Sequence, residues 1–175
     1  MKRHIAYLRY VLRHKWFVFL ACSRCRVPFV QAVIHDWHKF LPSEWLPYAE
    51  TFYAPDGSKR YVDSPAFALA WLRHQQRGKH HWQNWLITWD KGTTEPLPMP
   101  EKYIREMVAD WLGAGHAING TPVDVTDWKW LRENIHRIRM HDHTRHYLIG
   151  IIEGIGGVYP FAEERAAIDA AKETP

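Results

Sequence analysis

One short segment of this 175-residue chain carries residue types that could bind a metal ion. It reads IHDWHKF over residues 34–40, and its His35 and Asp36 are adjacent, so they could point two ligating atoms at one ion. Imidazole is the commonest side-chain metal ligand, and histidine is the side chain whose unperturbed pKa lies near neutrality. Because a His-Asp dipeptide is common in proteins, its meaning depends on partners elsewhere in the chain.

Further potential ligands lie before and after this pair in a distinctive order. The chain has a His, then His-Asp, then a single His, a double His and finally an Asp, and this order is much more specific than any one member. The chain also contains ten tryptophans, which can build the apolar walls of such a site. For any single histidine, a structural role on a crowded helix face is the more common alternative. The candidate ligands are His14, His35, Asp36, His74, His80, His81 and Asp110.

Two glutamates could support these ligands. Glu106 and Asp110 are spaced i, i+4 and therefore share a helix face. Glu106 could orient a ligating histidine or act as a general base, and a salt-bridged surface glutamate is the alternative. Glu44, just after HDWHKFLPS, is a weaker candidate of the same kind. A second His-Asp pair, in HDH at residues 141–143, is a weaker ligand candidate because it begins a predicted helix, where aspartate is favoured electrostatically.

Basic side chains flank the candidate ligands and could bind a phosphate-bearing substrate. A planar arginine guanidinium matches phosphate geometry, and a lysine supplies a compact charge. Each of these residues taken alone is more typical of a solvated charge. The candidate substrate-binding residues are Lys39, Arg73, Arg77, Lys79 and Arg145.

The ordered histidines and aspartates resemble the HD-domain superfamily of metal-dependent phosphohydrolases, whose helical fold builds a metal site from a His, an adjacent His-Asp pair and a late Asp. HDWHKF is similar to the HD-x-x-K pattern, with Lys39 where such members often carry a lysine that contacts phosphate. We therefore expect Asp36, Lys39 and Glu106 to take part in catalysis. The resemblance implies that the first ion is bound by His14, His35, Asp36 and Asp110.

Dinuclear members of that superfamily bind a second ion. The resemblance implies that His74, with one or both of His80 and His81, supplies ligands for it. The double His follows closely after His74, and no Gly-Tyr-Pro extension follows it, which departs from those members. The number of ions therefore stays open at one or two, and a cyclic dinucleotide substrate is not indicated.

The chain also resembles an uncharacterised family of small phage and bacterial proteins, over roughly residues 7–145. The segments that carry this resemblance are IHDWHKFLPSEWLPY, AWLRHQQRGKHHWQNW and MPEKYIREMVADWLGAG. That family supplies no assigned reaction, so it bears on the boundaries of the fold more than on function.

The ligand types favour particular ions and a particular reaction. Mixed His and Asp ligands suit Mn, Fe, Zn, Ni or Co better than an all-oxygen Mg site, and such ions lower the pKa of bound water. We predict a metal-dependent phosphohydrolase with one or two divalent transition-metal ions that acts on a nucleotide or another small phosphate ester. One alternative is a non-enzymatic module that binds nucleic acid or a protein partner through a fold with a structural His cluster. Another is an HD-like oxygenase with a di-iron centre.

These side chains need a folded scaffold, and the composition supports one. With 175 residues, 46% apolar and 24% charged, the chain fits one globular domain. Apolar residues recur at helical spacing, and no run of alternating residues is long enough to make a sheet persuasive. We predict a single all-α domain, a helical bundle of the HD-domain type over residues 1–160, followed by a C-terminal tail or short helix over residues 161–175.

Local start and stop signals predict where the helices lie. Ser43 is typical of the N-cap of one helix and Ser64 of the next, and either Gly113 or Gly115 is expected to end a later one. The predicted helices span residues 3–21, 28–40, 43–52, 65–78, 100 to 113 or 115, 127–139 and 143–153, with residues 80–89 open between helix and strand and residues 90–99 as a loop.

Charge and cysteine usage bear on partners and compartment. The net charge of +4 is not concentrated in a long basic run, so nucleic-acid binding is permitted rather than indicated. Cys22 and Cys25 form a Cys-x-x-Cys pair, but no second pair completes a zinc site, and we expect reduced structural thiols. The apolar segment 16–22 is too short to cross a bilayer, so we expect a cytoplasmic protein without membrane association. The many aromatic residues leave a homodimer open.

Overall fold

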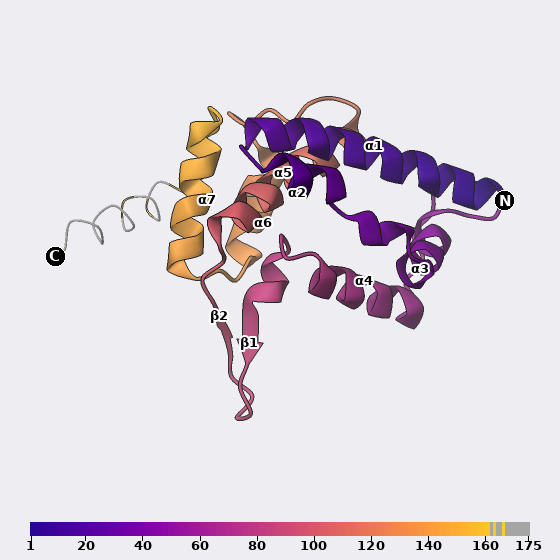
Figure 1. The fold of residues 1–175 in the computed structure, drawn as a ribbon, viewed down its shortest axis with the longest axis horizontal. Helices are drawn as coiled ribbons and strands as arrows, with labels where there is room; N and C mark the ends of the chain where they lie inside the picture. Colours follow the sequence, from indigo (N-terminus) through magenta and orange to yellow (C-terminus); the bar gives the residue numbers. More distant parts are fainter. Residues whose placement is uncertain (162, 164–165, 167–175) are drawn as a thin grey trace.

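The computed structural model describes residues 1–161, 163 and 166, which form a helical bundle with one small hairpin (Figure 1). The all-α class is confirmed apart from this hairpin, and the predicted tail over residues 161–175 lies almost entirely outside the described residues. The elements in chain order are α1 (Lys2–Arg24), α2 (Phe29–Ile34), a 3₁₀-helix (Trp37–Phe40), α3 (Pro42–Phe52), α4 (Pro65–Arg77), a 3₁₀-helix (Trp82–Trp85), β1 (Leu86–Thr88), β2 (Thr94–Pro96), α5 (Glu101–Asn119), α6 (Lys129–Asn134), a 3₁₀-helix (Ile135–Arg137) and α7 (Asp142–Gly154).

The most extensive packing between described elements joins α1 to α5. Their contact is close because α5 carries Gly113, where a Cβ atom would lie 2.5 Å from the backbone nitrogen of Val18. α5 continues to Asn119 and ends at Gly120, whose left-handed φ of +84° suits a helix C-terminus. The predicted end at Gly113 or Gly115 is wrong, because a glycine needed for a helix crossing has the same local signature as a stop signal.

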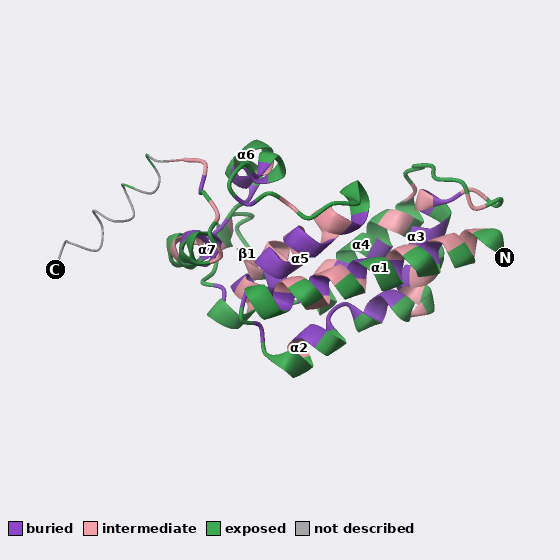
Figure 2. Ribbon diagram, turned by 90° about the horizontal axis from the view of Figure 1, so that it is seen from above, coloured by how far each residue is buried: buried purple, intermediate pink, exposed green. Residues whose placement is uncertain are grey.

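Two apolar clusters flank the middle of α1. One contains Val18 and Cys22 together with side chains of α5 and α7, and the other contains Tyr7 and Val11 together with side chains of α3 and α4. His14 lies between these two pairs on the same buried stripe of α1. Figure 2 shows buried segments on both α1 and α5. A polar residue therefore occupies the junction of two apolar clusters.

The predicted helix over residues 28–40 is interrupted at the His-Asp pair. α2 ends at Ile34, His35 has an extended ψ, and Asp36 adopts a left-handed φ of +53° before the 3₁₀-helix begins. Aspartate is one of the few residues besides glycine that visit this region. His35 and Asp36 thus lie at a sharp turn, whereas the sequence predicted that they lie on one helix.

The two predicted serine N-caps have opposite outcomes. Ser64 caps α4, and its Oγ accepts a hydrogen bond from the N–H of Phe67 at 3.1 Å, which confirms the prediction. Ser43 is not a cap, because Leu41 takes that position and Pro42 is the first helical residue. Proline is favoured there, since its missing N–H has no partner to lose at a helix start.

Two further regions differ from regular helices. Residues 80–89 form a 3₁₀-helix and β1, and β2 falls in the predicted loop, so an antiparallel hairpin pairs Leu86 with Pro96. The predicted helix over residues 127–139 is divided into α6 and a 3₁₀-helix. The hairpin extends away from the helices in Figure 1. Within the described residues, no helix has both the length and the apolar character needed to traverse a bilayer.

Arg26 allows a direct test of backbone strain at the end of α1. It adopts a left-handed φ of +58°, where glycine is the usual residue, and its N–H bonds to the carbonyl of Ser23. Replacing Arg26 by Gly should remove the steric penalty and raise the free energy of unfolding by about 1 kcal/mol, as measured by urea denaturation. The control Ser23→Gly, inside α1, should lower the free energy of unfolding. An unchanged or lower stability of Arg26→Gly would contradict this assignment of strain.

Candidate metal centre

Three segments far apart in the sequence bring four potential ligands together. α1 contributes His14, the turn after α2 contributes His35 and Asp36, and α5 contributes Asp110. His14 Nε2 lies 3.6 Å from Asp36 Oδ2 and 3.3 Å from Asp110 Oδ1. His35 Nε2 lies 3.5 Å and 3.3 Å from the same two oxygens. The four residues that the sequence indicated as the first ligand set therefore meet at one point.

The spacing of these four donor atoms is that of ligands around a common ion. Nitrogen and oxygen ligands bind Zn²⁺ at about 2.0–2.2 Å, so neighbouring ligand atoms of a tetrahedral ion lie about 3.3–3.6 Å apart. Hydrogen bonds between nitrogen and oxygen are shorter, at about 2.7–3.2 Å. The observed separations run from 3.3 Å to 3.6 Å and fall in the first range. The residues therefore fit a divalent transition-metal ion.

Several polar atoms in this cluster lack the partners that buried groups normally have. Among the described residues, His35 Nε2, Asp36 Oδ1 and Asp110 Oδ1 are buried without a hydrogen-bond partner. Buried polar atoms nearly always have hydrogen-bond partners in folded proteins. Several such atoms without partners, close together, therefore favour a bound cation. The side chain of Asp110 is 14% exposed, against at most 3% for the other three ligands. The cluster therefore reaches solvent beside Asp110.

Glu106 holds the ring of His35 through the nitrogen that faces away from the cluster. Its Oε1 accepts from His35 Nδ1 at 2.9 Å and lies 3.4 Å from Nδ1 of His80, while Oε2 accepts from the Gln31 amide at 2.6 Å. Burial acts to raise the pKa of Glu106, but the hydrogen bonds from the two histidines outweigh burial and lower this pKa to about 2. The ionised carboxylate thus orients His35 with Nε2 toward the cluster.

A second group of histidines lies around Asp36. His74 Nε2 lies 3.7 Å from Asp36 Oδ2, while Nε2 of His38 and Nε2 of His80 lie 3.7 Å and 3.5 Å from Oδ1. His81 joins Asp36 and His74 in a group whose donor atoms all lie within 4.8 Å of one another. All three histidines predicted for a second ion therefore face the cluster, and His38 joins them.

Glu44 and Gly78 shape this second group. Glu44 on α3 is fully buried, and its Oε2 accepts from Nδ1 of both His38 and His74 at 3.0 Å, while Oε1 pairs with Arg77 at 2.6 Å. A Cβ atom at Gly78 would lie 2.9 Å and 2.8 Å from the rings of the double His that follows. Sequence reasoning missed His38 as a ligand and ranked Glu44 low, although the HDWH spacing places His38 beside the His-Asp pair.

The charge balance around Asp36 favours a bound cation. Among the described residues, only two fixed cations, Lys39 and Arg77, pair with the four carboxylates that meet here. If the imidazoles are neutral, two negative charges are left, which is the charge that one divalent ion neutralises. The four carboxylates are Asp36, Glu44, Glu106 and Asp110.

The pKa values of the ligands reflect the same demand for positive charge. Burial lowers the pKa of His14 to about 4, so this ring is neutral at pH 7. Burial also acts to lower the pKa of His35, but the carboxylates around it, Asp36 above all, outweigh burial and raise this pKa to about 10. Lys39 Nζ lies 2.7 Å from Asp36 Oδ2, and the carboxylates keep the pKa of Lys39 above its usual value despite burial.

The predicted phosphate-binding cations lie in different surroundings. Lys39 is buried inside the cluster, and Arg77 is paired with a buried carboxylate. Arg145 lies on α7 and donates a hydrogen bond to the hydroxyl of Tyr159. Arg73 on α4 and Lys79 after it are exposed and lie close in sequence to the histidines that are candidate ligands. The structure thus brings one of the five predicted cations, Lys39, into direct contact with the candidate metal ligands.

The second His-Asp pair has a structural position at the start of α7. His141 is the N-cap residue, and its Nδ1 accepts a hydrogen bond from the N–H of His143 at 3.1 Å. The donor groups found among the described residues do not include His141, Asp142 or His143. Their role is to begin a helix.

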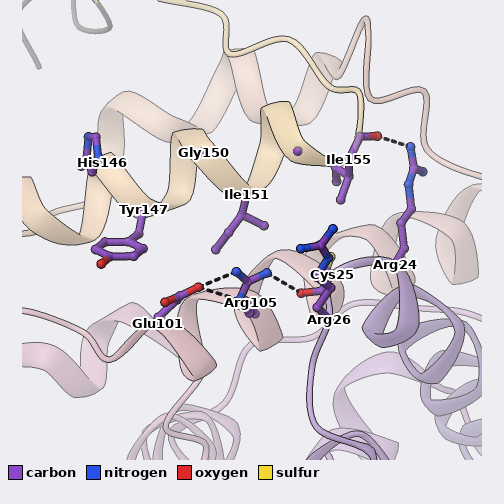
Figure 3. Close-up of a pocket in the computed structure, with 11 residues that line it drawn as sticks. Arg24, Cys25, Arg26, Glu101, Arg105, His146, Tyr147, Gly150, Ile151 and Ile155 are labelled. Carbon is purple, nitrogen blue, oxygen red and sulfur yellow. Dashed lines mark hydrogen bonds and ion pairs between the residues drawn. The ribbon is translucent and has the colours of Figure 1, made fainter. Parts of the chain in front are cut away.

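A separate cavity of about 350 Å³ lies between the end of α1, the start of α5 and α7 (Figure 3). Two of the three arginines that line it bond to protein groups. Arg24 donates to the carbonyl of Ile155 at 2.6 Å, and Arg105 donates to the carbonyl of Cys25 at 3.0 Å and pairs with Glu101. The four residues of the first ligand set do not line this cavity.

One family model matches residues 3–154, and its description is a family of unknown function, DUF5662. The chain belongs to this family. No curated protein and no solved structure gives a significant match. The matched range contains every candidate ligand from His14 to Asp110, so the candidate metal-binding cluster lies within the residues that match the family.

Cys22 and Cys25 give a test of the expectation that the Cys-x-x-Cys pair is structural. Both thiols are free and buried, and burial raises the pKa of Cys22 to about 12 and that of Cys25 to about 11. Since the thiolate is the reactive form, the native protein at about pH 8 should react with a disulfide reagent such as DTNB far more slowly than the unfolded protein. The reaction should speed up as the pH rises toward these pKa values. Fast, stoichiometric labelling of the native protein at about pH 8 would contradict the structural role.

Proposed function

We propose that this protein is a metal-dependent phosphohydrolase that acts on a nucleotide or another small phosphate ester. The observation that carries the proposal is the ligand-like spacing of the four donor atoms, 3.3 Å to 3.6 Å, at a buried site that reaches solvent. The chain order of these ligands, with Lys39 in an HD-x-x-K position, is similar to the HD-domain superfamily and supports this reaction class. The proposed ligands are His14, His35, Asp36 and Asp110.

A divalent transition-metal ion at this site would lower the pKa of a bound water and polarise a phosphoryl oxygen. The side chains of the protein support that chemistry by orientation and charge. Glu106 fixes the ring of His35, and Asp36 and Asp110 supply the negative charge that holds a dication. The partly exposed side of Asp110 is where a substrate would approach the ligands.

Lys39 is the residue that we propose to contact the phosphate. Its side chain is 10% exposed, and its ammonium pairs with Asp36 and lies 3.4 Å from His14 Nε2, next to two of the proposed ligands. An ammonium in such a poorly solvated position attracts a phosphate anion more strongly than it would in water. Arg73 and Lys79 are left to bind more distant parts of a substrate, whereas Arg77 serves Glu44.

Replacing Asp110 by Asn tests the proposal, because the variant removes a ligand charge and keeps the side-chain size. Asp36 is a poorer target, since it also holds a left-handed backbone. Untagged wild-type protein should contain at least one transition-metal ion per chain by elemental analysis and should release phosphate from a member of a nucleotide panel. Asp110→Asn should lose metal affinity by more than about 100-fold, and phosphate release with it. Asp142→Asn, at the start of α7, is the control and should resemble the wild type.

Three other results would redirect the proposal. An ion retained at full affinity in Asp110→Asn would show that the ligand set is wrong. An iron-containing, oxygen-sensitive protein that releases no phosphate would favour the oxygenase alternative. A metal-free wild type that binds nucleic acid with strong salt dependence would favour the binding module.

A further inference from the structure

We propose that the exposed face of α1 and the neighbouring α2 bind the surface of a membrane that contains anionic lipids. The residues that carry this proposal lie outside the candidate ligand set, so it does not depend on the metal centre. The expectation of no membrane association came from the length of the apolar segments, which excludes spanning a bilayer. Binding to a bilayer surface needs only an apolar helix face with basic residues beside it.

α1 carries apolar side chains on two sides, and only one side is covered by the rest of the protein. The covered side contains Tyr7, Val11, His14, Val18 and Cys22. Each residue advances about 100° around a helix, which places a second stripe of apolar residues roughly opposite the first. That stripe consists of Ile5, Leu8, Leu12, Trp16 and Leu20, whose exposed fractions run from 37% to 58%. A helix that is apolar on two sides normally buries both, so the second stripe indicates an interaction surface.

α2 extends this apolar surface. It packs beside α1, and its Phe29, Val30 and Val33 are 71%, 69% and 49% exposed. The ring of Phe29 meets that of Phe19 edge-on at 6.0 Å, and Phe19 stacks on Trp16 at 6.2 Å, so the two helices share one patch. Figure 2 shows exposed segments on both helices, which lie next to each other. The exposed stripe of α1 and these residues of α2 form the α1–α2 face.

The charges beside the α1–α2 face are positive. α1 contains two lysines and four arginines, and neither α1 nor α2 contains an acidic residue. Lys2, Arg9 and Arg13 are exposed and spaced seven and four residues apart, so they form a row along one edge of the face. Within the described residues, the ion pairs of α1 through a lysine or arginine are limited to that of Arg3 with Glu50. The row is therefore available to an external anion such as a lipid phosphate.

This charge pattern favours an anionic lipid surface over a second copy of the chain. Symmetric pairing of two copies through the α1–α2 face would bring two positive edges together, with no carboxylate on either helix to offset them. A lipid surface supplies acyl chains for the exposed apolar side chains and phosphates for the row of cations. The exposed ring of Trp16 suits the same location, because tryptophan is enriched at the boundary between headgroups and acyl chains.

Two double variants test the apolar and the electrostatic contributions separately. Trp16→Gln with Phe29→Gln removes apolar surface at two residues that are 58% and 71% exposed, so folding should be little affected. Arg9→Gln with Arg13→Gln removes two exposed charges and keeps extended polar side chains.

Each double variant has a matched control away from α1 and α2. Trp89→Gln, after β1, alters a tryptophan that is 46% exposed. Lys91→Gln with Lys129→Gln, in the hairpin loop and on α6, removes two exposed cations and changes the net charge by the same amount as the arginine variant.

The measurement is cosedimentation of the full chain with vesicles of phosphatidylcholine alone or mixed with phosphatidylglycerol. Wild type should bind the anionic vesicles more tightly than the neutral ones and should lose affinity as salt is added. The arginine variant should bind the anionic vesicles about 25-fold more weakly, since each basic residue at such a surface contributes about fivefold. The Trp16 and Phe29 variant should bind them at least about 10-fold more weakly. Both controls should match wild type.

Several outcomes would overturn the proposal. Wild type that does not bind anionic vesicles, or binds neutral ones equally well, would reject the anionic surface. A stable dimer by light scattering that dissociates in the Trp16 and Phe29 variant, without vesicle binding, would assign the face to a second copy. Weakened binding in the lysine control would show that net charge alone is responsible. If the Trp16 and Phe29 variant does not fold, the arginine variant decides. Metal content should stay unchanged throughout, so failure here is distinct from failure of the metal centre.

Discussion

Asp36 is a carboxylate with no exposed side-chain surface, and much of the structure serves to compensate its charge. An unpaired buried carboxylate costs several kcal/mol, so oriented donors or positive charge must surround it. Five imidazole rings and one ammonium lie within 3.7 Å of its two oxygens, and they come from α1, the turn after α2, the following 3₁₀-helix, α4 and the segment after α4. No single segment could supply these groups, so the site exists only when the helices are docked.

The apolar framework determines where these donors meet. On α1, His14 lies one turn before Val18, and on α5, Asp110 lies one turn before Gly113. The backbone of Val18 and Gly113 touch so closely that a Cβ atom would not fit between them. This close crossing brings the two helices near enough for His14 Nε2 to reach Asp110 Oδ1 at 3.3 Å. A larger residue at Gly113 would separate the helices and therefore the ligands, although it would lie outside the site itself.

Sequence reasoning reached the features that local rules encode and missed those that depend on packing. The order of His and Asp residues was enough to select the four residues that meet, and Ser64 was recognised as a cap because capping is local. The left-handed turn at Asp36 has no such local signal, since aspartate also continues helices, and Gly113 has the same signature at a crossing as at a stop. Glu44 was undervalued because its importance comes from two rings that approach it in the folded state.

The two glutamates differ in how far apart their contacts lie along the chain. Glu44 and His38 are six positions apart, so part of the second group can form once the 3₁₀-helix and α3 are adjacent. Glu106 and His35 are 71 positions apart, and their contact requires α5 to dock. An ion that binds only the docked arrangement stabilises it by mass action. Because the first candidate ligand set joins α1, the turn after α2 and α5, an ion bound there would stabilise contacts between segments that lie far apart in the chain, and metal binding and folding would be coupled through that position.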